Sequence, residues 1–329
     1  MLANGVRYVY PTQLPSRAFT LTLIQNTGSR MVIGGRMQAQ RFRFRVLLVL
    51  VIMVALTAVA NAGDYAAIIV YGDSFSDNGN LFTDLGIPQP PYWNGRYSNG
   101  PVAVERLSSC LGVPLLDEAW GGATTGVGDV VDNGTTTTLG YDDLPGMTTS
   151  YNATINSFPP GQVGASLVIV WGGINDFATN GLTTLTADHA VSDILALVTA
   201  LQAKGAKHIL VPGIPDLGFA PLYLAEGKGG YANYISDYFN LKLRMSLPAG
   251  VLFYDTATLY RKMIQNPSQY GLTNVHQPCY VQSSGVCQNP YQYLFWDLLH
   301  PTEHVHQILG RELSLATTGL SVCPLHVQR

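Results

Sequence analysis

The chain has 329 residues, 47% of them hydrophobic and only 12% charged, so it can form one large domain or two small ones with a substantial core. All seven charged residues among residues 1–62 are arginines, which leaves 11 Lys and Arg against 21 Asp and Glu, a net charge of −10, in the remainder. This acidic remainder argues against a nucleic-acid partner, because phosphate binding requires a basic patch. It also disfavours electrostatic docking on anionic membranes. The low charged content suits a secreted protein better than a cytosolic one.

The N-terminal 62 residues have the pattern of a targeting sequence. An Arg-rich segment, 41–45, precedes an uninterrupted apolar run, 46–60, and small residues end at Ala62. This order predicts a secretory signal peptide that is cleaved after Ala62. The alternative is an uncleaved membrane anchor, although the run is shorter than the roughly 20 residues that a spanning helix prefers. Met31 or Met37 is an alternative start of the chain, because a signal peptide that included residues 1–36 would be longer than normal, whereas one beginning at Met37 has a normal length.

We therefore expect two parts, an N-terminal extension with its signal peptide at 1–62 and a single domain at 63–329. In that domain an apolar run at 66–70 changes abruptly to Gly72, Asp73 and Ser74, which marks the end of a buried strand and a tight turn. A serine at the carboxyl end of a central strand, with a helix starting just after it, lies where open α/β sheets place their ligands. Ser74 is the candidate nucleophile, although Gly, Asp and Ser are also ordinary turn residues.

Turn residues interleaved with aromatics predict a long surface loop at 88–100. Its aromatics either line a substrate cleft or, through Tyr92 and Trp93, attach the loop to the core. Pro101 is well placed to open a helix that extends to Leu111.

A second strand, at 113–116, leads to a Gly-rich turn at 121–126, where a backbone N–H can be presented without a Cβ in the way. Residues 126–161 have little periodicity and predict an irregular excursion with one helix. They carry two N-glycosylation sequons, at Asn133 and Asn152, which are surface sites if the host glycosylates the protein.

Apolar runs and helical periodicity alternate through the next hundred residues. The predicted strands are 167–171, 208–211 and 251–254, and the predicted helices are 186–204, 231–245 and 256–264. Five strands alternating with helices imply right-handed crossovers and a parallel sheet covered on both faces. We therefore expect a three-layer α/β/α sandwich around a five-stranded parallel sheet, with a flavodoxin-like arrangement.

The four cysteines predict two disulfides in a secreted chain, with three possible connectivities. The short loop between Cys279 and Cys287 favours that pair, which leaves Cys110 with Cys323. Both pairs would be structural, because no zinc spacing or CxxC motif is present.

A second polar segment near the C-terminus runs from Asp297 to Glu303. Pro301 is well placed to end one element and begin a helix, so His300 lies on a loop at a helix start, three residues after Asp297. A serine hydroxyl needs a base to take its proton, and a carboxylate must hold that base in the right tautomer. A spacing of three allows Asp297 to fold back onto the imidazole. The other six histidines are interpreted as structural or exposed: His189, His208, His276, His304, His306 and His326.

Four ordered segments resemble the conserved blocks of the GDSL, or SGNH, hydrolases. They are 72–76 (GDSFS), 121–124 (GGAT), 173–176 (GIND) and 297–301 (DLLHP), and they span most of the chain after residue 63. Segments 90–100 and 211–215 resemble the secreted branch, which includes plant GDSL lipases, lecithinase and haemolysin-type enzymes and fungal acetylesterases. The fourth residue of the name motif is Phe75 instead of Leu, a departure that does not touch the catalytic atoms.

The resemblance implies an SGNH hydrolase fold and a serine hydrolase that needs no cofactor. It implies that Ser74 attacks an ester carbonyl, that His300 takes and returns the proton, and that Asp297 orients His300. It further implies that the oxyanion is held by the backbone N–H groups of Ser74 and Gly122 and by the side-chain amide of Asn175. We expect a secreted carboxylic ester hydrolase that acts on a small-molecule, lipid or acylated-sugar ester, with no obligate protein partner.

Alternatives remain open at this stage. One is a carbohydrate acetylesterase acting on acetylated plant polysaccharide, and another is a catalytically silent binding protein on the same fold. No Gly-x-Ser-x-Gly elbow surrounds Ser74, which counts against an α/β-hydrolase. The sequence has no His-Glu-x-x-His motif that would require a metal, and Asp73 and Asp176 are only weak candidates for metal ligands. Acyl-chain preference depends on loops whose shape the sequence does not predict.

Overall fold

The structure is a computed structural model that describes residues 65–128, 144–320 and 323. All of them belong to one compact unit, Ala60–Arg329. The predicted signal peptide, the alternative start sites and the sequon at Asn133 lie outside the described residues.

A five-stranded sheet forms the centre of this unit. Its strands are β1 (Ile68–Gly72), β2 (Leu115–Asp117), β3 (Leu167–Trp171), β4 (His208–Pro212) and β5 (Leu252–Tyr254). They are ordered β2-β1-β3-β4-β5 and every neighbouring pair is parallel. This is the flavodoxin-like order. Every residue of β1 and β3 is buried, which explains their continuous apolar sequences, because a central parallel strand is covered on both faces.

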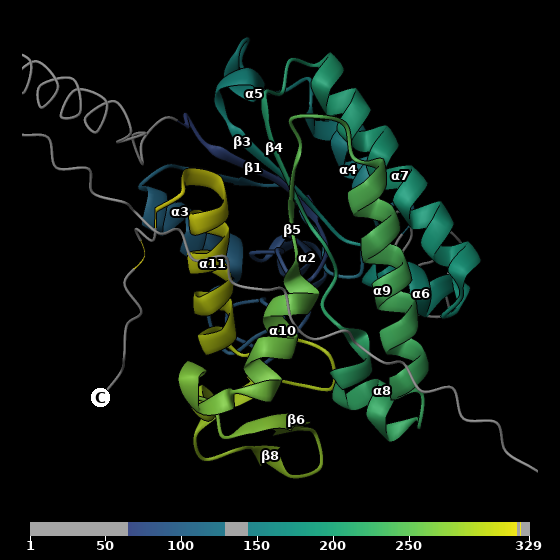
Figure 1. Ribbon diagram of the computed structural model, residues 1–329. Coiled ribbons are helices and arrows are strands. Elements are labelled where there is room, and N and C mark those ends of the chain that lie inside the picture. Colours follow the sequence, from purple (N-terminus) through teal and green to yellow (C-terminus); the bar gives the residue numbers. More distant parts are fainter. Residues whose placement is uncertain (1–64, 129–143, 321–322, 324–329) are drawn as a thin grey trace, which may run out of the picture. The chain divides into compact units, whose positions relative to one another are not determined.

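Helices cover both faces of the sheet, which confirms the predicted three-layer sandwich (Figure 1). One layer contains α3 (Ala103–Leu111) and α11 (Glu303–Thr318), and the other contains α4 (Met147–Thr154), α7 (Thr184–Ala203) and α9 (Gly229–Ser246). The remaining helices are α2 (Asn80–Leu85), α5 (Gln162–Ala165), α6 (Ile174–Asn180), α8 (Pro221–Ala225) and α10 (Thr256–Gln265). Short 3₁₀ turns occur at Leu217–Phe219, Pro267–Tyr270 and Pro290–Gln292.

Helix α7 shows how local sequence and packing agree. It begins at Thr183, whose side chain accepts a hydrogen bond from the Thr186 N–H, and it stops just before Gly205, which has a φ of 94°. By length and composition α7 is apolar enough to cross a membrane, but most of its apolar side chains are buried at helical spacing and it packs against α9. Burial within the protein accounts for that hydropathy.

Helices α2 and α6, which flank the site, begin at places that the sequence did not predict. A helix was expected directly after Ser74, but α2 begins at Asn80, because the Asp77 carboxylate accepts hydrogen bonds from the N–H groups of Gly79, Asn80 and Leu81. These are the N–H groups that a helix start leaves without partners. Helix α6 begins at Ile174, within the GIND segment that follows β3, where the sequence predicted no helix.

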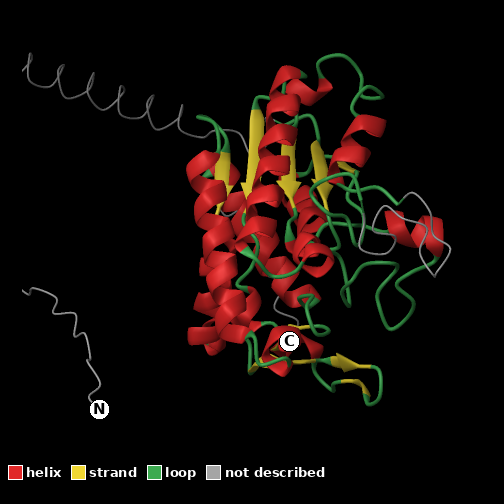
Figure 2. Cartoon of the chain, turned by 90° about the vertical axis from the view of Figure 1, so that its right-hand side faces the viewer, coloured by secondary structure: helices red, strands yellow, loops and turns green. Residues whose placement is uncertain are grey.

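The segment between α10 and α11 was expected to be a loop, and it contains four short strands. Strands β6 (Asn274–Pro278) and β9 (Tyr293–Phe295) pair in parallel, and β7 (Tyr280–Val281) and β8 (Gly285–Val286) form an antiparallel hairpin. Such short strands leave too few residues for a periodic pattern. Figure 2 shows that these strands lie beyond the carboxyl ends of the central strands.

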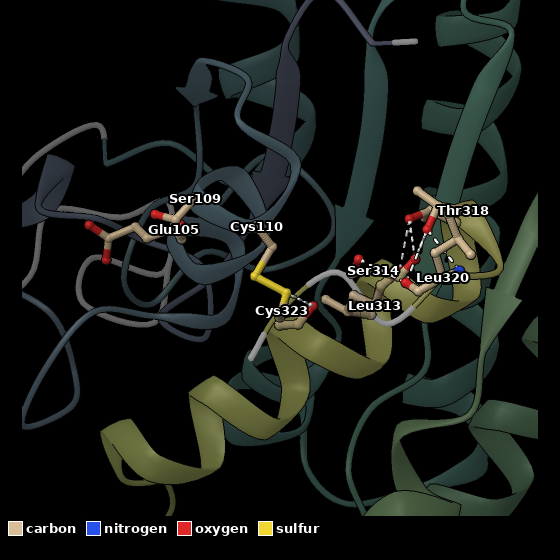
Figure 3. Close-up of a disulfide and its surroundings, with 10 residues drawn as sticks. Glu105, Ser109, Cys110, Leu313, Ser314, Thr318, Leu320 and Cys323 are labelled. Carbon is tan, nitrogen blue, oxygen red and sulfur yellow. Dashed lines mark hydrogen bonds between the residues drawn. A yellow bond between two sulfur atoms is a disulfide. The ribbon is translucent and has the colours of Figure 1, made fainter. Parts of the chain in front are cut away.

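Both predicted disulfides are present. Cys279 and Cys287 close the β7–β8 hairpin, and Cys110 pairs with Cys323 across 213 residues of sequence. Figure 3 shows the Cys110–Cys323 bond joining α3 to the segment that follows α11. The two helices pack against each other, so this bond holds one outer layer of the sandwich together.

Candidate active site

Three side chains from distant parts of the sequence form one hydrogen-bonded chain. Ser74 Oγ lies 2.8 Å from His300 Nε2, and His300 Nδ1 lies 2.8 Å from Asp297 Oδ2. An ionised carboxylate can only accept, so Nδ1 carries a proton and Nε2 of the neutral ring accepts the Ser74 hydroxyl hydrogen. This arrangement is the one that activates a serine for nucleophilic attack.

Ser74 lies in a tight turn at the carboxyl end of β1. The Asp73 carbonyl accepts hydrogen bonds from the N–H groups of Ser76 and Asp77, and the Asp73 carboxylate accepts one from Phe75. Gly72, the last residue of β1, lets this strand lie close to β3, since a Cβ at that position would lie 2.7 Å from the Trp171 carbonyl oxygen. The hydrogen bonds of the turn and the pairing of β1 with β3 together hold the backbone that carries Ser74.

Phe75, which departs from the family motif, packs directly beside the site. Its ring centroid lies 5.9 Å from that of Trp171 and 5.8 Å from that of His300. The side chain is fully buried. It therefore fills the space between the nucleophile turn, the central sheet and the imidazole ring.

Asp297 and His300 lie on a loop that is closed by its own backbone. The Trp296 N–H donates to the His300 carbonyl at 2.7 Å, and Phe295 forms an isolated bridge with Pro301. Inside this loop Asp297 Oδ1 accepts hydrogen bonds from the N–H groups of Leu299 and His300. The spacing of three residues thus brings the carboxylate back onto the imidazole, as the sequence predicted.

The second carboxylate oxygen of Asp297 has two partners of its own. Oδ2 accepts the His300 Nδ1 hydrogen bond and a second bond from the Tyr92 hydroxyl, both at 2.8 Å. Burial alone would raise the pKa of Asp297, but the charge of His300 and the hydrogen bonds that it and Leu299 donate outweigh burial and lower that pKa. Asp297 is therefore ionised near neutral pH.

The loop at 88–100 contributes aromatic side chains to the site. Tyr92 reaches Asp297, and the Tyr97 ring lies 4.8 Å from the His300 ring at a tilt of 32°. Trp93 is 39% exposed and carries the Arg96 guanidinium over its ring instead of entering the core. The aromatic-rich sequence of this loop was the available signal for these contacts, but the sequence could not say which ring meets which partner.

The segments that carry the three expected oxyanion donors are connected by hydrogen bonds near the carboxyl ends of β1 and β3. The turn that contains Gly122 is held to β1 by the Trp120 N–H, which donates to the Gly72 carbonyl, and Gly122 itself has a φ of 93°, which favours glycine. The same turn is held to α6, since Asn175 Nδ2 donates one hydrogen to the Ala123 carbonyl. Within the described residues, neither Ser74 nor Gly122 uses its backbone N–H in a hydrogen bond to protein.

Two aspartates beneath the site are buried and have raised pKa values. Burial raises the pKa of Asp73 to about 7, and its Oδ2 has no hydrogen-bond partner in the described structure. Burial also raises the pKa of Asp176 to about 6, although Thr125 donates to this carboxylate from both its N–H and its hydroxyl. No group of three or more His, Cys, Asp or Glu in the described part of the chain is placed to hold a metal ion.

The remaining predicted positions take no part in the Ser74–His300–Asp297 chain of hydrogen bonds, although the His306 ring lies 6.4 Å from that of Phe75. His306 is fully buried and accepts the Ala103 N–H, and burial lowers its pKa to about 3. His304 is buried with Nε2 2.6 Å from the Tyr270 carbonyl. Asn152 is exposed on α4, so its sequon is on the surface.

A large cleft opens on the outer side of His300. Its volume is about 1030 Å³, and its lining includes Tyr92, Tyr97, Leu222, Tyr280, Val281 and Leu299. The β7–β8 hairpin supplies one wall. The site therefore combines a buried hydrogen-bonded serine with an apolar approach to the imidazole.

Residues 68–313 match the model of the GDSL-like lipase/acylhydrolase family. The chain is 30% identical over 243 residues to a phosphatidylcholine-sterol acyltransferase of Aeromonas hydrophila, covering 69% of this chain and 70% of that protein. It is 29% identical over 322 residues to a GDSL esterase/lipase of Arabidopsis thaliana, covering 77% and 89%. A carbohydrate acetylesterase structure from Sinorhizobium meliloti covers 75% of this chain and 96% of its own, at 16% identity and a TM-score of 0.42.

Proposed function

The chain belongs to the GDSL-like lipase/acylhydrolase family and is a carboxylic ester hydrolase, and we propose that Ser74, His300 and Asp297 carry out its reaction through an acyl-enzyme. The observation that carries the proposal is the continuous chain of hydrogen bonds from Ser74 Oγ to Asp297 Oδ2. It joins residues that are 226 positions apart in sequence, so it arises from the fold and not from local chain geometry.

In the first half of the reaction, Ser74 Oγ attacks the ester carbonyl carbon while His300 Nε2 takes its proton. The imidazolium that forms is stabilised by Asp297, which stays ionised because its pKa is lowered. The carbon–oxygen bond to the alcohol then breaks, and His300 Nε2 donates its proton to the leaving alkoxide. The products of this half are an alcohol and an acyl group on Ser74.

Charge develops on the carbonyl oxygen during both halves. We assign its stabilisation to the N–H groups of Ser74 and Gly122 and to the second amide hydrogen of Asn175. The first hydrogen of that amide is held by the Ala123 carbonyl, which fixes its direction before substrate arrives. Fixed donors of this kind favour the transition state over bound substrate, because they need not reorganise as the charge appears.

Water completes the second half of the reaction. His300 takes a proton from water, the resulting hydroxide attacks the acyl carbon, and the proton returns to Ser74 Oγ as the acid leaves. None of these steps requires a group beyond the side chains and N–H groups already named.

The replacement Ser74→Ala tests this assignment. We expect it to lower kcat for p-nitrophenyl acetate by roughly 10⁴-fold or more, because the acyl-enzyme can no longer form. Ser76→Ala is the matched control, since Ser76 is buried in the same turn and its hydroxyl has no partner among the described residues. Full activity in a folded Ser74→Ala protein would overturn the proposal.

The dependence of rate on acyl length narrows the class of ester substrate. A rate that falls steadily from acetate to palmitate would favour a carbohydrate or other short-chain acetylesterase, and a rate that rises would favour a lipase. Two disulfides fit an oxidising compartment. We propose that residues 63–329 are the secreted domain, which sequencing the N-terminus of the protein from culture medium would test.

A further inference from the structure

The cleft beside His300 is larger than an acetyl group requires. Its volume is about 1030 Å³, at the upper end of the range of small-molecule sites. One wall is the β7–β8 hairpin, closed by the Cys279–Cys287 bond, and another is the aromatic loop at 88–100, whose Tyr92 ring packs against Tyr280. We call this space the hairpin cleft, lined among others by Tyr92, Tyr97, Tyr280, Val281, Leu298 and Leu299.

The position of the hairpin cleft relative to the reacting atoms assigns it to one side of the ester. Its lining includes His300 and Asp297, and it includes none of the three donors assigned to the oxyanion. In the tetrahedral intermediate the oxyanion faces those donors, whereas the oxygen of the leaving alcohol must lie within hydrogen-bond reach of His300 Nε2. The substrate group that continues outward past His300 is therefore the alcohol group.

The chemistry of the lining limits the kind of alcohol. The described residues that line the cleft include no Lys, Arg or Glu, and Asp297 is already engaged by four hydrogen bonds. The other polar residues of the lining, besides the tyrosines and His300, are the uncharged Gln89, Gln282 and Ser283. Val281 and Leu298 are 38% and 48% exposed, although both are apolar. Binding of an apolar, uncharged group over these side chains is favourable, because it removes apolar surface from water.

We propose that the hairpin cleft is the binding site for the alcohol part of the ester, and that it selects esters of long or bulky, uncharged, apolar alcohols. This inference rests on the proposed function, because it takes His300 as the group that protonates the leaving oxygen. It names a preference that acyl-length measurements alone do not detect.

Isomeric esters separate the two sides of the substrate. Octyl acetate and ethyl octanoate have the same atoms, and they differ only in whether the long chain is on the alcohol or on the acid. A fully buried CH₂ group is worth about fourfold in kcat/KM, and an open cleft captures part of this. We expect kcat/KM for octyl acetate, followed by acid release at constant pH, to exceed that for ethyl octanoate by about tenfold or more.

Two valines of the hairpin provide a matched pair of variants. Val281 lines the cleft, whereas Val286 lies on the partner strand, is similarly exposed and is not part of the lining. We expect Val281→Gln to lower kcat/KM for octyl acetate by about threefold and to leave ethyl acetate unchanged. Val286→Gln should change neither substrate.

Three outcomes would overturn the inference. They are a faster reaction with ethyl octanoate, equal rates for the two isomers, or equal effects of Val281→Gln and Val286→Gln. Failure of the proposed function gives a different result, because Ser74→Ala would then retain hydrolysis of p-nitrophenyl acetate. The isomer ratio is measured on the activity that Ser74→Ala abolishes, so the two failures are distinguishable.

Discussion

The two halves of the active site are held by different kinds of structure. Ser74 and Asn175 follow β1 and β3, which are buried throughout and pair with each other along their whole length. His300 and Asp297 lie on a loop between β9 and α11, held by a few backbone bonds, by Tyr92 and by a two-stranded sheet. The nucleophile half is thus part of the core, whereas the base half is attached to it.

This difference separates two tasks. Attack and charge stabilisation need donors at fixed positions, and a parallel sheet supplies them because its strand ends are placed by the whole core. Substrate selection needs a surface that can vary without disturbing the core, and the β7–β8 hairpin beside His300 supplies it. The two disulfides follow the same division, one in the outer helical layer and one in the hairpin.

The largest expected effect separates these two disulfides. Replacing Cys110 and Cys323 with alanine should lower the free energy of unfolding by about 5 kcal/mol, because this bond restricts 213 residues of the unfolded chain. Replacing Cys279 and Cys287, which are 8 residues apart, should cost about 2.5 kcal/mol. Denaturant unfolding measures both values.

Catalysis should show the opposite order for the two disulfide variants. The Cys279/Cys287 variant is expected to lose most of its preference for octyl acetate over ethyl octanoate, whereas the Cys110/Cys323 variant keeps it. If the Cys279/Cys287 variant lost more stability than the Cys110/Cys323 variant, the base half would be part of the core and not merely attached to it.

On the nucleophile side, Asn175→Ala should lower kcat by about 10²- to 10³-fold with little change in KM, because the amide acts on charge that develops only in the transition state. Asn180→Ala, at the exposed end of the same helix, is the control. Steady-state kinetics with p-nitrophenyl acetate distinguish the two. A change confined to KM would remove Asn175 from the oxyanion site.

On the base side, Tyr92→Phe removes the hydroxyl that donates to Asp297 and keeps the ring. A hydrogen bond to a charged group is worth about 1.5–3 kcal/mol, so we expect kcat to fall by roughly tenfold while KM changes little and the melting temperature falls by a few degrees. Tyr280→Phe is the control, because its ring packs on Tyr92 in the same cleft. A purely structural role for Tyr92 would lower the melting temperature but leave kcat intact.

The last expected effect is a pH dependence of stability that comes from the buried Asp73. Its folded pKa is raised to about 7, so its contribution to stability is fully present below about pH 4 and is lost as pH rises through about 7. Relative to Asp73→Asn, the wild-type free energy of unfolding should therefore fall with rising pH by up to about 1.4 kcal/mol per pH unit. Asp84→Asn, at an exposed position on α2, should follow the wild type, and parallel curves for all three proteins would contradict the expectation.

Several features of the site were accessible from the sequence because they are local. Residues 167–171 are apolar throughout and form the buried strand β3, and the change from apolar to Gly, Asp and Ser marked the turn that contains Ser74. The three-residue spacing of Asp297 and His300 predicted their hydrogen bond. The eight-residue spacing of Cys279 and Cys287 favoured their disulfide.

Other features depend on contacts between distant segments. The Tyr92–Asp297 hydrogen bond joins residues 205 positions apart, and the Tyr97 ring meets His300 only because the 88–100 loop lies against the base half. Helix α2 starts late because Asp77 binds both its first N–H groups and the N–H of Gly121 from another turn. No local pattern encodes such partners.

The sequence by itself determined the layers, the strand ends and the residues able to do the chemistry, because burial and turn formation are properties of short segments. Only the tertiary structure decided what surrounds that chemistry. The aromatic contacts of His300 and Asp297 and the cleft beside the β7–β8 hairpin arise where loops from different parts of the chain meet. Their geometry is set by packing against the whole core, which a single segment does not contain.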